Sequence, residues 1–288
     1  MSVFFCDNDC ELWFDKIDEL GIQTILMPYS VNGEELFYDF GRNTDFDKFY
    51  NDVRQGAIVK TSALNTFDYI NYFEPHLKNG DDIIYVHFSS EMSGTFSSME
   101  KAIIELKEKY PERSIKTVDT KSICMGAGAI VYEAAKLWKS GASDDEIIKW
   151  VEENRDKFAT YFLVEDLKYL KAGGRISPAV ALIGKCLNMK PILKIDAEGK
   201  IGKVSTTRGF KQGMKALLDN LKAVGENVAD YPINIIHANN PENAEFLKNL
   251  ILEEVGPDAT IWMQPIGPVI GCHCGPGTVG LVFHSKCR

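Results

Sequence analysis

The chain has 288 residues, of which 45% are hydrophobic and 25% are charged, so it carries enough apolar side chains for a full core and is not a disordered chain. Lys and Arg number 32 against 41 Asp and Glu, a net charge of −9. This balance argues against a general nucleic-acid or anionic-membrane surface, because such surfaces bind through clustered basic side chains.

Strand-like and helix-like segments alternate in the first half of the chain. Strands are predicted at residues 3–6, 24–27, 83–88 and 114–118, and helices at 45–54, 97–110, 124–138 and 143–157. Helical spacing from Leu12 to Leu20 predicts a helix that stops at Gly21, and Ser143 with Glu146 predicts a capping box. Asn32-Gly33 is a hairpin signal. This alternation predicts an α/β fold with a mostly parallel sheet flanked by helices.

The second half has a different order of elements, typical of an α+β domain. Strands are predicted at residues 158–164, 191–195, 200–204, 233–237, 259–263 and 278–283, with helices at 178–187, 208–221 and 242–254. The length also favours two domains. We therefore expect an N-terminal α/β domain at 1–158 and a C-terminal α+β domain at 159–288.

Two hydroxyl-rich segments follow predicted strands. Ser93, Gly94 and Thr95 come after the strand at 83–88, and Thr61-Ser62 precede another helix. Ligands of open α/β sheets bind at the carboxyl ends of strands, where a glycine lets the backbone approach an anion. Ser and Thr are also ordinary helix caps, so both an anion cradle and simple capping remain open.

The segment 267–277 has four glycines and two prolines, which predicts an irregular backbone displaying His273. Arg175 and Arg208 stand beside glycines, as phosphate or partner contacts or as solvated charges. No apolar run approaches the ~20 residues of a membrane span. The N-terminus lacks the basic start of a signal peptide, which favours a cytoplasmic location.

Cys272 and Cys274 flank His273, a pattern that suggests either a zinc site completed by Cys6 and Cys10 or a redox pair. No four-ligand set with usual spacing can be assembled, so we expect no metal and ordinary reduced thiols. Asp7 and Asp9 follow an apolar run, a pattern similar to the start of haloacid-dehalogenase-like phosphatases. There the first acid is the nucleophile and the second the general acid, which makes a phosphatase the alternative function.

Several of these segments together resemble the DegV family of bacterial fatty-acid-binding proteins over nearly the whole chain. The resemblance is carried by Thr61-Ser62, residues 88–98, 117–122, Met125-Gly126, 167–176, 187–192, Arg208-Gly209 and 266–277. The family usually opens with Asp-Ser-Ser or Asp-Ser-Thr, whereas Asn8 and Asp9 replace the hydroxyls here.

The resemblance implies a non-enzymatic protein that holds one long-chain fatty acid, such as palmitate, between two domains without a cofactor. Thr61, Ser62, Ser93 with Gly94, and His273 would bind the carboxylate. It further implies a fatty acid kinase as partner, to which the acid is presented for lipid metabolism or transport. Arg175 and Arg208 would contact that partner or the phosphate.

Overall fold

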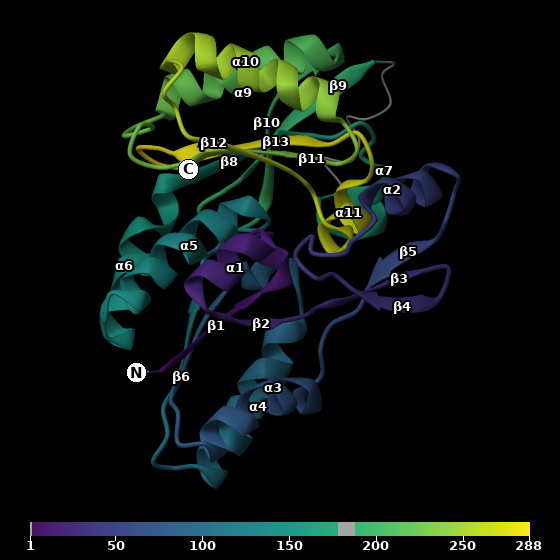
Figure 1. Cartoon of the computed structure of the whole chain (residues 1–288). Helices are drawn as coiled ribbons and strands as arrows, with labels where there is room; N and C mark the ends of the chain where they lie inside the picture. Colours follow the sequence, from purple (N-terminus) through teal and green to yellow (C-terminus); the bar gives the residue numbers. More distant parts are fainter. Residues whose placement is uncertain (1, 178–187) are drawn as a thin grey trace.

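The computed structural model describes residues 2–177 and 188–288 of the chain. The helix predicted at 178–187 lies outside the described residues. The described residues form three sheets, shown in Figure 1 with their helices. Within the described residues, no helix combines the length and the apolar character needed to cross a membrane.

The first sheet has four strands, all parallel, in the order β2-β1-β6-β7. Its strands are β1 (Val3–Asp7), β2 (Gln23–Ile25), β6 (Ile83–His87) and β7 (Ile115–Asp119). Every residue of β6 is buried, as is usual for a parallel strand covered on both faces. The predicted parallel sheet is thus confirmed.

Helices α1 (Phe14–Leu20), α3 (Thr66–Lys78), α4 (Thr95–Lys109), α5 (Met125–Lys139) and α6 (Asp144–Asn154) surround this sheet. The predicted stop of α1 is confirmed at Gly21, whose φ of 71° is the left-handed conformation that glycine favours. Ser143 and Glu146 form a capping box at the start of α6. Short 3-10 helices occur at η1 (Asn8–Cys10), η2 (Ser90–Met92) and η3 (Arg155–Lys157).

A second sheet has three antiparallel strands in the order β4-β3-β5. Its strands are β3 (Pro28–Val31), β4 (Glu34–Phe37) and β5 (Val59–Thr61), and α2 (Phe46–Arg54) lies between β4 and β5 in the chain. Asn32 and Gly33 both have positive φ, so the predicted hairpin turn is confirmed. Thr61 ends β5 in this small sheet rather than in the parallel one.

The third sheet has six strands in the order β10-β9-β8-β13-β11-β12, and only β11 and β12 run parallel. Its strands are β8 (Phe158–Leu163), β9 (Met189–Ile195), β10 (Ile201–Arg208), β11 (Ile233–His237), β12 (Ile261–Pro265) and β13 (Val279–His284). β13 lies between β8 and β11. The last strand along the chain is therefore a central strand of this sheet.

Both faces of β8 are buried, and successive residues of this strand belong to different cores. Tyr161 and Leu163 join the core formed with α9 (Gly209–Val224) and α10 (Pro241–Val255). Phe162 points the other way and belongs to the core shared with the parallel sheet. The α/β class is confirmed, whereas the division into domains at residue 158 stays a prediction.

The prediction of an irregular backbone for residues 267–277 is wrong, because most of this segment forms α11 (Pro268–Cys274). Pro268 stands at the first position of the helix, where a missing N–H costs nothing. Gly271 faces Phe49 and Tyr50 so closely that a side chain would collide with them. Gly275 ends the helix with a φ of 71°. α11 lies against the short helix α7 (Lys168–Ala172) and against β5.

Candidate ligand-binding site

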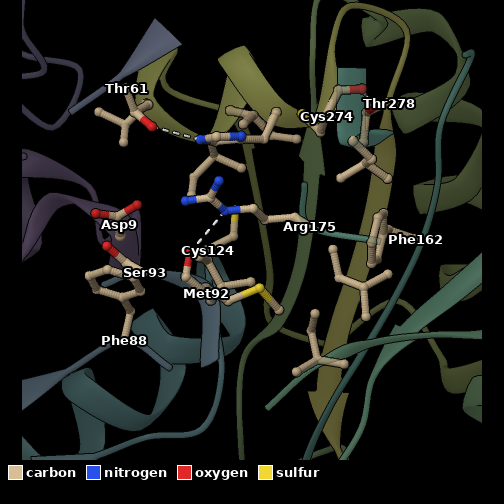
Figure 2. Close-up of a pocket in the computed structure, with 18 of the residues that line it drawn as sticks. Asp9, Thr61, Phe88, Met92, Ser93, Cys124, Phe162, Arg175, Cys274 and Thr278 are labelled. Carbon is tan, nitrogen blue, oxygen red and sulfur yellow. Dashed lines mark hydrogen bonds between the residues drawn. The ribbon is translucent and has the colours of Figure 1, made fainter. Parts of the chain in front are cut away.

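A cavity lies between the parallel sheet and the six-stranded sheet, with a volume of about 860 Å³ including its mouth. Its walls are mostly apolar, as Figure 2 shows for part of the lining. The apolar side chains include Phe88, Met92, Ile123, Phe162, Ile195 and Ile236.

Polar side chains of several separate segments line the same cavity. They include Asp9, Thr61, Ser62, Ser93, Arg175 and His273. Five of these, all except Asp9, are among the carboxylate or partner residues expected from the sequence. The chain thus brings together groups that are more than 200 residues apart, namely Thr61 and His273.

Thr61 and His273 contact each other directly, with 2.8 Å between Thr61 Oγ1 and His273 Nε2. α11 presents the imidazole and the end of β5 presents the hydroxyl. His273 Nδ1 is buried and has no hydrogen-bond partner among residues 2–177 and 188–288. Gly173 leaves room for this nitrogen, because a Cβ there would overlap Nδ1.

Burial, together with the charge of Arg175, lowers the pKa of His273 to about 4. The imidazole is therefore neutral at pH 7 and has one donor and one acceptor nitrogen. When Nε2 carries the proton and donates to Thr61 Oγ1, the Thr61 hydroxyl is free to donate into the cavity. His273 then orients a donor instead of supplying a positive charge.

Ser93 follows η2, with its hydroxyl at the cavity wall. Ser93 Oγ accepts a hydrogen bond of 3.2 Å from the Thr95 backbone N–H, which leaves its own O–H able to donate. Thr95 does not line the cavity; its hydroxyl is buried and lies 3.0 Å from the Tyr69 hydroxyl. Ser62 also lines the cavity and is largely exposed.

Arg175 differs from the displayed surface charge that the flanking glycines suggested. Its side chain is half-buried, with Nε donating a 3.0 Å hydrogen bond to the Met92 carbonyl and Nη1 donating to the Gly173 carbonyl. Figure 2 shows the guanidinium group extending into the cavity. These backbone contacts hold the cation at the polar end of the pocket.

Two of the expected site residues lie elsewhere. Gly94 is not part of the cavity lining, and a Cβ there would meet no atom within 4 Å, so no close approach requires a glycine. Arg208 ends β10, is exposed, and is also outside the cavity.

The geometry does not favour the phosphatase alternative. Asp7 Oδ1 accepts from the Asp9 N–H at 3.1 Å, and Oδ2 accepts from the Tyr85 hydroxyl at 2.9 Å and the Phe88 N–H at 3.1 Å. Both oxygens of the expected nucleophile are thus engaged in the interior, and the side chain is fully buried. Asp7 therefore acts as a cap of η1.

Asp9 lines the cavity, a role that the sequence analysis did not assign to it. It follows the carboxyl end of β1, which lies beside β6, the strand that leads to Ser93. The rule used for Ser93, that ligands bind beyond the carboxyl ends of parallel strands, could have identified Asp9 as well.

The six described cysteines are free, and Cys272 and Cys274 are buried. Burial raises the pKa of both thiols to about 12, so they are uncharged at pH 7. Among residues 2–177 and 188–288, no three His, Cys, Asp or Glu side chains are grouped so that they could hold a metal ion.

Comparison with known proteins gives matches over nearly the whole chain. A family model described as "Uncharacterised protein, DegV family" matches residues 5–286. A DegV domain-containing protein of Clostridium perfringens is 38% identical over 281 residues, covering 98% of this chain and 96% of the relative. One from Lactococcus lactis is 32% identical and covers 91% of each chain.

Solved structures match equally broadly. The fatty acid-binding DegV family protein from Thermus thermophilus has a TM-score of 0.86 at 27% identity, covering 98% of this chain and 99% of that chain. DegV from Bacillus subtilis, described as a fatty acid binding protein, has a TM-score of 0.83 at 27% identity, covering 99% of both chains.

Proposed function

Because this chain belongs to the DegV family, we propose that it binds one long-chain fatty acid in the cavity between its two large sheets. The acyl chain lies along the apolar walls and the carboxylate lies at the polar end. The single observation that carries the proposal is a mostly apolar cavity whose polar groups converge from separate segments of the chain.

Burial of the acyl chain supplies most of the affinity. A chain like that of palmitate buries ~14 methylenes at ~0.8 kcal/mol each, roughly 11 kcal/mol before costs. Lost mobility and side-chain ordering remove several kcal/mol of this. We therefore expect acids of roughly 14–18 carbons to bind best.

The carboxylate is held by hydroxyl groups. A buried carboxylate is costly unless it accepts hydrogen bonds. Thr61 and Ser93 each have a hydroxyl hydrogen that can point into the cavity, and Ser62 lies at its exposed side. His273 acts through Thr61, and Arg175 supplies a positive charge nearby.

We further propose that the protein presents its bound acid to a cytoplasmic fatty acid kinase, for lipid metabolism or transport, without a cofactor and without catalysing the reaction itself. This part is supported by Arg175, which lines both the cavity and an outer groove formed with Lys60, Tyr169 and Cys272. Arg208 is exposed and free to contact a partner or phosphate from the end of β10.

Native mass spectrometry of the purified protein, followed by extraction of bound lipid, tests the binding proposal. We expect one fatty acid of roughly 14–18 carbons per chain. The sample is then delipidated by unfolding and refolded, and saturable binding of the same acids is measured by calorimetry. A correctly refolded protein that binds none of these acids would overturn the proposed function.

A further inference from the structure

Four acidic or amide residues lie at the end of β1 and in the turn after it, and the side chains of three of them bind other parts of the protein. Asp7 accepts three hydrogen bonds. Asn8 contacts the Met27 backbone through both side-chain atoms, with the Met27 N–H donating to Oδ1 at 2.8 Å. Both Glu11 oxygens accept from the Gly267 N–H, at 3.0 and 2.8 Å. These three side chains therefore stabilise the fold.

Asp9 is the exception. Its exposed fraction is 6%, it lines the cavity, and its carboxyl group points into the open space in Figure 2. No hydrogen bond or ion pair reaches this carboxyl group from residues 2–177 or 188–288, although the backbone of Asp9 is held by Asp7 and Cys124. An acid buried without a partner is costly, which indicates that its partner is a molecule in the cavity.

The charges around Asp9 favour its protonated form. Burial, and then the neighbouring carboxyl groups of Asp7 and Glu11, raise the pKa of Asp9, while Arg175 opposes them. Burial also raises the pKa of Asp7 to about 7 and that of Glu11 to about 8. The other titratable groups that interact with Asp9 are Tyr69, Tyr85 and Cys124, each with a pKa raised by burial.

Across the cavity, His273 is neutral because its pKa is lowered to about 4. Arg175 is thus the one positive charge that faces Asp9 within the described part of the chain. One guanidinium group can balance one carboxylate. A bound fatty acid adds a second carboxyl group to this space, and two carboxyl groups at one site do not both ionise.

We propose that Asp9 binds the head group of the fatty acid and shares one proton with it, as an acid–carboxylate hydrogen-bonded pair balanced by Arg175. This inference rests on the proposed function and adds that binding requires one proton. The O–H of one carboxyl group donates to an oxygen of the other, a short and strong type of hydrogen bond. No bond other than this hydrogen bond forms or breaks.

The pair makes affinity depend on pH in a defined direction. The free fatty acid is ionised near neutral pH, as carboxyl groups ordinarily are. At pH values where Asp9 of the empty protein is protonated, Asp9 already supplies the shared proton, and the dissociation constant does not change with pH. Above the pKa of Asp9, binding must take up a proton, and the dissociation constant rises up to tenfold per pH unit.

The experiment measures palmitate binding by calorimetry from about pH 6 to about pH 9.5, with the delipidated wild type and with Asp9→Asn. Buffers of different ionisation enthalpy count the protons taken up. We expect wild-type affinity to fall at the alkaline end, with uptake approaching about one proton per acid. Asp9→Asn keeps a hydrogen-bond donor but does not titrate, so its affinity should stay flat.

Two controls isolate Asp9 from its neighbours. Glu11→Gln removes a nearby acid outside the cavity, and the alkaline fall in affinity should remain. The fatty alcohol of the same length has no carboxylate, so its binding to the wild type should not weaken with pH. If Asp9→Asn does not fold, Asp9→Ser takes its place, and the wild-type profile and the alcohol still test the inference.

The outcomes separate this inference from the proposed function. Wild-type protein that binds palmitate with the same affinity and no proton uptake over the whole range would overturn the role of Asp9 alone. Wild type and Asp9→Asn with the same alkaline fall would also overturn it, because another group then titrates. Failure of the wild type to bind at any pH would instead contradict fatty-acid binding itself.

Discussion

One apolar wall of the cavity consists of strand residues of the six-stranded sheet, whereas the polar end is built from the end of β5, the turn after η2 and α11. Phe162, Ile195 and Ile236 lie on three strands of one sheet. Thr61, Ser93 and His273 belong to three elements that are not neighbours in the chain. Many wall contacts share the binding energy, whereas a few polar groups hold the carboxylate. Changes at the polar end should therefore cost more per residue than changes along the wall.

The largest effect is expected from Ser93→Ala. A hydrogen bond to a charged group contributes about 1.5–3 kcal/mol, so fatty-acid binding should weaken roughly ten- to a hundredfold. The methyl ester of the same acid should lose much less, because it has no charge to hold. Calorimetry of both ligands checks this.

Ser97→Ala is the matched control for that variant, because the Ser97 hydroxyl is exposed and donates to the Gly94 carbonyl outside the cavity. A double-mutant cycle with His273→Ala should give a non-zero coupling energy, since Ser93 and the Thr61 hydroxyl that His273 orients bind one carboxylate. Wild-type affinity in both single variants would show that the polar end does not bind the head group.

A smaller loss, of roughly tenfold, is expected from Gly173→Ala. The new Cβ would overlap His273 Nδ1 and displace the imidazole from Thr61. Gly94→Ala is the matched control, since both glycines have φ near −75° and Gly94 has open space around it. Equal affinities of the two variants, measured by calorimetry, would mean that the position of His273 does not matter.

The wall should respond in graded steps. Each added methylene that is buried contributes ~0.8 kcal/mol, which is about a fourfold gain in affinity. Binding constants for a series of saturated acids measure this slope. If the two ends act independently, Ser93→Ala should lower every affinity equally and leave the slope unchanged. A different slope in that variant would argue that the ends are coupled.

The smallest effect on lipid affinity is expected from Arg208→Ala, because Arg208 is outside the cavity. Its dissociation constant should match the wild type, whereas acyl-phosphate formation with a cognate kinase should fall. Arg175→Ala should lose both, since Arg175 lines the cavity. If Arg175→Ala and Arg208→Ala gave the same result in both assays, the different roles expected for the two arginines would be wrong.

Local signals in the sequence predicted the elements well. Helix caps and tight turns depend on a few neighbouring residues. The helix end at Gly21, the cap at Ser143 and the turn at Asn32-Gly33 therefore occur at the positions that the sequence indicates. The prediction for the segment around Pro268 was wrong, since its glycines allow close contacts with residues far away in the sequence, as Gly271 does with Phe49 and Tyr50.

The polar residues of the cavity were identified in part. Thr61, Ser93 and His273 carry the family resemblance and do line the cavity. Asp9 looked like one of a pair with Asp7, and only the hydrogen bonds of Asp7 separate their roles. The sequence suggested that Arg175 is displayed at the surface. Its contact with Met92 could not be predicted, because only the tertiary fold brings these two segments together.

The central position of β13 has a consequence for synthesis on the ribosome. Phe158 pairs with His284 and Leu163 with Val279, partners more than a hundred residues apart. Until Val279–His284 have emerged, β8 and β11 have no neighbour between them, and the six-stranded sheet is two separate pieces. The parallel sheet needs no strand beyond Asp119 and can form earlier. The nascent chain therefore assembles the turns that carry Asp9 and Ser93 first, whereas His273 on α11 and the acyl-binding wall are added only near the end of translation, with strand edges open to chaperones until then.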